Sequence, residues 1–166
     1  MDQSVVLKIT SNYPDIFRGI QKHYDYLNNL YHANKIPFFL EEISKGFVFI
    51  VRNMEFFEKI RDPSIIKRKL LDVKQNPPQV NQKVLDILAN FDFQQNNLIF
   101  NIECDMKNSE LVFDILQESF NKINTNIRVS PTDFNLIQIE FKSRQDFIFY
   151  IQHWISLTAD LVKNIS

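Results

Sequence analysis

The sequence predicts an α+β fold in two layers, rich in helix and built from two halves of matching organisation. Strand-like alternation and helix-like periodicity follow one another twice along the 166 residues, in the order strand, helix, hairpin, helix. The segment 76–79, Asn-Pro-Pro-Gln, interrupts the chain between the two rounds. The hydrophobic fraction of 45% suits a globular chain of this length, which can bury a core without disulfides or metal.

The first half, residues 1–76, begins with an apolar segment at 5–9 that predicts a strand. Asn12 is expected to cap a helix in which Pro14 occupies the first turn. Apolar residues recur every three or four positions from there to about residue 31, which favours one long amphipathic helix.

A hairpin is predicted next, with strands at 36–43 and 47–52. Gly46 supplies the permissive backbone that a short turn between them needs. Asn53 is expected to cap a short helix reaching residue 60, and Pro63 begins another helix that runs to about residue 74.

The second half, residues 77–166, repeats this order. The apolar spacing predicts helices at about 79–91 and 109–123, with a strand at 98–103 between them. A second hairpin is predicted from strands at 127–129 and 136–141, joined by a turn at 130–133.

The last element predicted is a long helix that ends near residue 163. Ser143 followed three residues later by Asp146 resembles a capping box, which marks a helix start. Its apolar stripe is expected to contain Phe147, Ile151 and Trp154, so that Phe149, Tyr150 and His153 lie off the stripe.

The two halves therefore share a topology, although the residues of one half show little identity with those of the other. Matching strands begin about ninety residues apart. Each half is expected to place its helices on one face of a small antiparallel sheet, in a ferredoxin-like arrangement. The sequence leaves open how the two sheets pair.

Glycine usage excludes several enzyme classes. The chain contains 16 Phe but only Gly19 and Gly46 as glycines, far apart in sequence. Phosphate-binding loops, dinucleotide-binding turns and nucleophile elbows all need closely spaced glycines. These classes are therefore ruled out, and no cofactor is predicted.

The expected location is the cytoplasm. Cys104 is the single cysteine, which excludes an intramolecular disulfide and fits a reducing compartment. The first residues lack the basic and apolar regions of a secretory signal, and the longest apolar runs are too short to cross a bilayer. A soluble protein without a membrane partner is expected.

No metal site or catalytic group is predicted. His23, His32 and His153 have no histidine or cysteine at the spacing of a zinc motif. Cys104 lies between Glu103 and Asp105, whose charges disfavour a reactive thiolate.

Two acidic arrangements remain to be weighed. Glu41 and Glu42 are adjacent on a strand, so they point to opposite faces and cannot act together on one bond. Glu103 and Asp105 could join Asp86 or Asp92 around a divalent cation, but nothing in the spacing fixes such a site. The protein is therefore expected not to be an enzyme.

One basic segment stands out in a chain of net charge −1. Between residues 59 and 74 there are six basic and two acidic residues. A basic helix can hold a nucleic acid or an acidic partner, and the alternative is a solvated helix face. The candidate binding residues are Lys59, Arg61, Lys67, Arg68, Lys69 and Lys74.

Adjacent aromatic residues are the second candidate for a surface. Two neighbouring rings cannot both lie at the centre of one helical stripe, so one ring either widens the core or reaches the surface. Aromatic rings at a surface are typical interface anchors. The candidate interface residues are Phe57, Phe149, Tyr150 and His153.

These observations favour a non-enzymatic protein that docks an aromatic-rich α/β surface onto another protein or onto its own copy as a homodimer. The first alternative is a nucleic-acid-binding accessory protein that uses the basic segment 59–74. The second alternative is a regulatory domain that senses a small ligand between the two halves.

Overall fold

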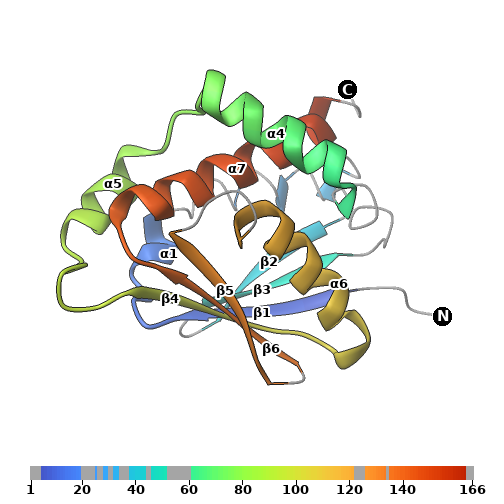
Figure 1. Cartoon of the computed structure of the whole chain (residues 1–166), viewed down its shortest axis with the longest axis horizontal. Coiled ribbons are helices and arrows are strands. Elements are labelled where there is room, and N and C mark those ends of the chain that lie inside the picture. The colour runs from blue at the N-terminus through green and yellow to red at the C-terminus, as the bar shows by residue number, and fades with distance from the viewer. Residues whose placement is uncertain are drawn as a thin grey trace.

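Six strands form one antiparallel sheet, and the helices lie on a single side of it (Figure 1). The computed structural model describes residues 5–19, 25, 28–29, 32–33, 38–43, 46–51, 61–121, 126–133 and 135–163. The strand order is β2-β3-β1-β4-β6-β5. The strands are β1 (Val5–Ser11), β2 (Phe38–Ile43), β3 (Gly46–Val51), β4 (Leu98–Glu103), β5 (Ile127–Asp133) and β6 (Leu136–Phe141).

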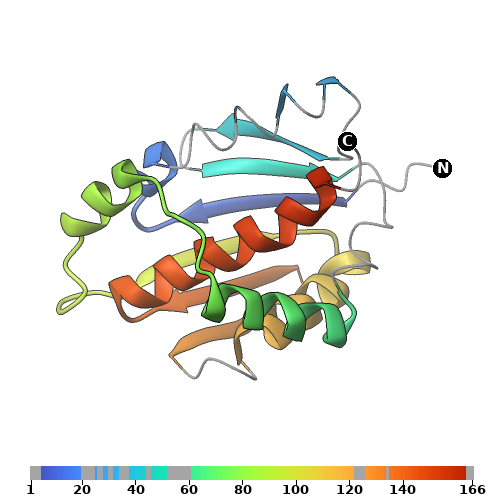
Figure 2. The ribbon, with the colours of Figure 1, turned by 90° about the horizontal axis from the view of Figure 1, so that it is seen from above.

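The two long helices α4 and α7 lie over the same face of the sheet. In Figure 1, α4 crosses in front of α7, and Figure 2 shows the two helices side by side, with α7 running obliquely over the sheet. The elements are α1 (Ile16–Gly19), α4 (Pro63–Gln75), α5 (Gln82–Ala89), α6 (Met106–Leu116), the π-helical η1 (Gln117–Asn121) and α7 (Arg144–Lys163).

The pairing of β1 with β4 joins the two parts of the chain into one sheet. Ile9 lies opposite Ile102, and Ser11 lies opposite Phe100. The predicted α+β class is confirmed. The pairing that the sequence left open is thereby answered, because the first strand of each predicted half pairs directly with the other and the strands form one sheet.

Alternating side chains give the sheet two different faces. Along β1, Val5, Leu7 and Ile9 are buried while Val6 and Lys8 are exposed. Strands β4 and β6 alternate in the same way, so their buried residues all point to the helices. The opposite face is more polar, as an antiparallel sheet allows.

The core is centred on the ring of Phe100 in β4. Its centroid lies 5.4 Å from that of Phe17 in α1 and 5.5 Å from that of Phe141 in β6. On α7, the rings of Phe147 and Tyr150 lie 5.6 and 5.8 Å from it. These contacts hold α1 and α7 against the middle of the sheet. The Phe17 ring is tilted against Phe100, and the other three rings meet it edge to face, a geometry that aromatic pairs prefer.

Side chains cap the helix starts in three places, of which one was predicted. The Asp62 side chain accepts hydrogen bonds from the backbone N–H and hydroxyl of Ser64 at the start of α4. The Asn81 side chain accepts from the N–H of Lys83 at the start of α5. The predicted cap at Ser143 is confirmed, since its hydroxyl accepts from the N–H of Asp146 at 3.2 Å.

The predicted cap at Asn12 is wrong. Its side-chain amide bonds the backbone of β4, donating to the carbonyl of Asn97 and accepting from the N–H of Ile99. The Asn12 side chain, which the sequence predicts to cap a helix, therefore links the end of β1 to the start of β4. Helix α1 begins later, at Ile16.

Three element boundaries differ from the prediction. The helix predicted at 79–91 is shorter, because Asn81 caps it and Asn90 ends it. The helix predicted at 109–123 begins at Met106 and becomes π-helical from Gln117. Strand β5 extends through the predicted turn at 130–133, with an irregular register between Pro131 and Asp133. The short helix predicted from Asn53 to residue 60 lies outside the described residues.

Within the described part of the chain, no helix is both long and apolar enough to cross a membrane.

Gly46 supports a prediction about sheet stability. A Cβ at Gly46 would lie 1.9 Å from the backbone oxygen of Ile9, a contact that only a shift of the backbone can relieve. We expect Gly46→Ala to separate β3 from β1 and lower the free energy of unfolding by about 3 kcal/mol or more. Urea unfolding followed by circular dichroism measures this loss.

Gly19→Ala is the matched control. A Cβ there would lie 3.0 Å from Cα of Val84, a tighter contact than usual but less severe than at Gly46. The higher helix propensity of alanine offsets part of the crowding, so the expected loss is below about 2 kcal/mol. Equal stability of the Gly46→Ala variant and the unaltered protein would contradict the close approach of β3 to β1.

Candidate functional site

The basic segment does not form one cluster, because α4 turns its residues in different directions. Lys67, Arg68 and Lys74 are exposed on the outer face of the helix. Lys69 is only 6% exposed and lies among the buried residues of α4. Lys69, one of the candidate binding residues, therefore does not share a surface with Lys67 and Lys74. Lys59 lies outside the described residues.

Arg61 lies just before α4 and faces α6. Its guanidinium is 3.9 Å from a carboxylate oxygen of Asp114, and both side chains are partly exposed. Such an ion pair contributes little to stability. The ion pair nevertheless directs Arg61 toward α6, so Arg61 does not lie with the cations on the outer face of α4.

The outer face of α4 also contains an exposed apolar residue. Leu71 is 50% exposed, the largest value among the large hydrophobic residues described, followed by Val6 at 42%. Residues three and four positions apart are neighbours on a helix surface. Leu71 is therefore bordered by Lys67, Arg68 and Lys74, and we call these four residues the α4 outer patch.

The predicted aromatic interface is not at the surface. Tyr150 is 6% exposed and His153 is fully buried, so the expectation that they lie off the buried stripe of α7 is wrong. Phe149 is partly buried and packs against the core. Phe57 lies outside the described residues.

Contacts on a second side of α7 explain why Tyr150 and His153 are buried. A helix that only covers a sheet buries one stripe, but α7 also contacts α4 on another side. Phe120 of the neighbouring η1 has its ring 5.3 Å from Tyr150 and 5.5 Å from His153. The buried face of α7 is therefore wide enough to include Tyr150 and His153 as well as Phe147.

His153 forms a buried polar pair with Ser119 of η1. The Nε2 atom lies 3.2 Å from the serine hydroxyl, while Nδ1 has no hydrogen-bond partner. A serine nucleophile needs a base oriented by a third group and a route for the substrate. Both side chains are buried and Nδ1 is unpaired, so the pair does not meet those requirements.

Cys104 is buried at the end of β4. Burial, reinforced by the charges of Asp105 and Glu103, raises the pKa of its thiol to about 11. In the described part of the chain, no three His, Cys, Asp or Glu side chains are close enough to hold a metal ion. The acidic residues considered around Glu103 and Asp105 therefore do not form a cation site there.

A cavity that the sequence did not indicate lies between α1 and the β2–β3 hairpin. Its volume is about 390 Å³, within the range of small-molecule sites. Its charged lining residues are Asp15, Arg18, Asp25 and Glu42. They are distant in sequence, so no local pattern indicated that they would line one cavity.

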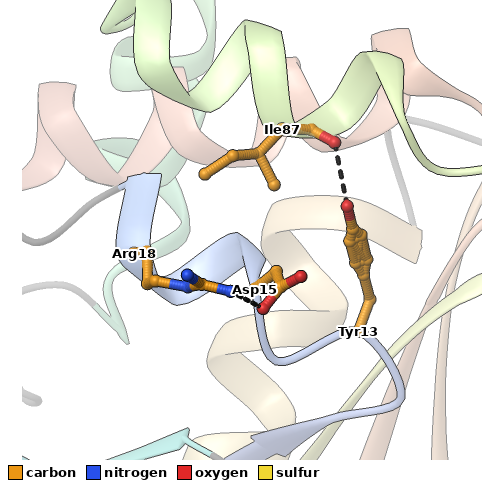
Figure 3. Close-up of polar contacts among 4 residues, drawn as sticks. All are labelled: Tyr13, Asp15, Arg18 and Ile87. Carbon is orange, nitrogen blue, oxygen red and sulfur yellow. Dashed lines mark hydrogen bonds and ion pairs between the residues drawn. The ribbon is translucent and has the colours of Figure 1, made fainter.

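The α1 side of this cavity is fixed to the neighbouring helix. The Tyr13 hydroxyl donates a hydrogen bond of 3.1 Å to the carbonyl of Ile87 in α5, and Arg18 forms an ion pair with Asp15 (Figure 3). A side chain at Gly19 would crowd Val84 of α5, which shows how closely the two helices approach.

The opposite side of the cavity is fixed by Asn28. Its amide donates to the carbonyl of Leu40 and its carbonyl accepts from the N–H of Leu40, both at 2.8 Å. This pair of bonds ties a helical position to the edge strand β2. Both walls of the cavity are therefore held in place without a ligand.

No protein-family model, curated protein or solved structure matches this chain. The functional argument therefore depends on the geometry of the α4 outer patch and of the cavity.

The Cys104 environment gives a prediction about thiol reactivity. At pH 8 a thiol with a pKa near 11 is about a hundredfold less ionised than an ordinary one, and burial limits access further. We expect Ellman's reagent to react with the folded protein at least about a hundredfold more slowly than with the protein in 6 M guanidinium. Equal rates would show that Cys104 is accessible and reactive.

His153 gives a prediction about pH. Burial lowers its pKa from 6.5 to about 4, so between these values an unfolded histidine binds a proton that the folded one does not. The free energy of unfolding should therefore fall as the pH falls through this range, by about 3 kcal/mol in total from this group. Urea unfolding at pH 7, 6, 5 and 4 measures the slope.

The controls separate this group from other titrating residues. His153→Gln should flatten the slope between pH 6.5 and 4, whatever it does to stability at pH 7. His32→Gln is the matched control, at an exposed histidine outside the core. An unaltered slope in the His153→Gln variant would contradict the prediction.

Proposed function

We propose that this protein acts by binding, as a non-enzymatic interaction protein, and that the α4 outer patch docks onto an acidic segment of another protein. The observation that carries the proposal is Leu71, half exposed and bordered by three cations. An apolar contact ringed by charge resembles an interface with a hydrophobic centre and a polar rim.

The placement of the aromatic residues changes which surface is proposed. The aromatic candidates on α7 pack within the fold and expose little surface that a partner could contact. They are Phe149, Tyr150 and His153. The position of α4 beside α7 supports the new assignment (Figure 2), since the exposed residues of α4 lie on the side away from its buried contacts with α7 and η1. Buried Ile66, Leu70 and Val73 hold the helix while its outer residues stay accessible.

Binding to nucleic acid is the second candidate. The same cations could contact phosphates, and such binding would depend strongly on salt. Leu71 distinguishes the two functions, because phosphate contacts do not need an apolar residue at the centre of the patch. The net charge of −1 also favours a protein partner over a polyanion.

We also propose that residues 1–76 and 77–166 are two copies of one ferredoxin-like unit. The strand order supports this, because β1, β3 and β2 follow outward from the centre as β4, β6 and β5 do on the other side. The free, buried thiol of Cys104 supports a cytoplasmic location. Small-ligand binding, the third function considered, was expected between the two halves. The cavity is lined by residues of the first half alone, and ligand binding there is developed below.

The test compares binding by the unaltered protein, Leu71→Ala and a Lys67→Gln/Arg68→Gln/Lys74→Gln variant. Lys69 is left unchanged because it is buried. The probes are an amphipathic peptide with Glu and Leu on one face, its Glu-to-Gln analogue, and single- and double-stranded oligonucleotides, all measured by fluorescence anisotropy. We expect the acidic peptide to bind and each variant to weaken it by about tenfold.

Val6→Ala is the matched control, since Val6 is also an exposed aliphatic residue but lies on the opposite face of the sheet. It should bind the peptide as the unaltered protein does. Oligonucleotide binding lost in the triple variant and kept in Leu71→Ala would favour the second candidate. Equal binding of the acidic peptide and its neutral analogue would overturn the proposed docking.

A further inference from the structure

Apolar and polar side chains line the cavity between α1 and the β2–β3 hairpin in similar shares. Phe17, Leu40 and Phe47 are buried and line it. The rings of Phe17 and Phe47 meet edge to face at 5.2 Å. A concave site in which apolar rings lie beside polar groups can hold a small molecule that has both an apolar and a polar part.

The charged lining is predominantly acidic. Asp15 precedes α1, Asp25 is at a helical position and Glu42 is on β2, and all three are exposed. Arg18 is the single cation among the described lining residues, and it is paired with Asp15. Asp25 and Glu42 form no ion pair with another described residue, so the lining has an excess of negative charge.

The arrangement of these carboxylates indicates which kind of cation the cavity could bind. They line the same cavity, yet no three acidic groups among the described residues approach closely enough to chelate a metal ion. Carboxylates that form no such chelating set and lie beside aromatic rings suit an organic cation with an apolar body, because the rings attract cations as well as apolar groups.

We infer that this cavity binds a small organic cation, an amine or guanidinium group carried on an apolar body. The apolar body lies against Phe17, Leu40 and Phe47, and the cationic group meets Glu42 and Asp25. This site is separate from the α4 outer patch and does not depend on its function.

The walls of the site are preorganised, which limits the cost of ordering on binding. Tyr13 and Gly19 hold α1 against α5 on one side, as Figure 3 shows for the Tyr13 hydrogen bond to Ile87. On the other side, Asn28 holds β2 through both backbone groups of Leu40.

Isothermal titration calorimetry of the full chain with 2-phenylethylamine tests the inference, with 2-phenylethanol as the neutral probe of similar shape. We expect the amine to bind at least about tenfold more tightly than the alcohol, because it gains charge-assisted hydrogen bonds with carboxylates. Failure of the amine to bind, or equal affinity for the two probes, would overturn the inference.

Variants place the cation within the site. Glu42→Gln should weaken binding of the amine by about tenfold. Glu41→Gln is the matched control, because Glu41 is opposite Val48 and therefore faces the other side of the sheet, whereas Glu42 is opposite Phe47. An equal effect of the two substitutions would show that the amine responds to general surface charge and would overturn the inference.

Two further variants test the same inference if circular dichroism shows that the Glu42→Gln variant does not fold. Asp25→Asn should weaken amine binding in the same direction as Glu42→Gln. Arg18→Gln removes the competing cation and should tighten binding, by about threefold for a charge this exposed. Tighter binding in Asp25→Asn, or weaker binding in Arg18→Gln, would contradict the placement of the cation.

Discussion

The rest of the structure depends on the aromatic packing around Phe100. This residue lies on β4, which β1 joins to the other side of the sheet, and its ring contacts rings from α1, β6 and α7. One side chain therefore connects the centre of the sheet to the helices at both ends of the sequence. The position of α1 in turn sets one wall of the cavity, and the position of α7 sets the surface on which α4 rests.

Local chemistry made most elements predictable. The strand at 98–103 and the hairpin around Gly46 follow from alternation and turn residues, and α4 follows from its proline and its apolar spacing. The single sheet was not predictable, because the pairing of β1 with β4 joins residues about ninety positions apart that share no local signal. Asn12 shows the same limit, since a residue typical of helix caps instead bonds a distant strand.

The candidate sites were only partly predictable for a related reason. Helical spacing separates Lys69 from Lys67 and Lys74 once the buried side of α4 is known, but the sequence does not say which helix will cover it. Tyr150 and His153 were misplaced because their burial depends on α4 and η1, which contact α7 from another direction. The cavity brings together Asp15, Asp25 and Glu42, and only tertiary packing makes them neighbours.

The amide of Asn28 has a further consequence for how copies of this chain behave in solution. An amide carries the same donor and acceptor as a peptide unit, so at Leu40 it occupies the place that an incoming strand would take on the edge of β2. On the far edge, β5 contains Pro131, which lacks an N–H, beside an irregular register. Both edges of the sheet thus resist recruitment of another chain into a growing β-aggregate.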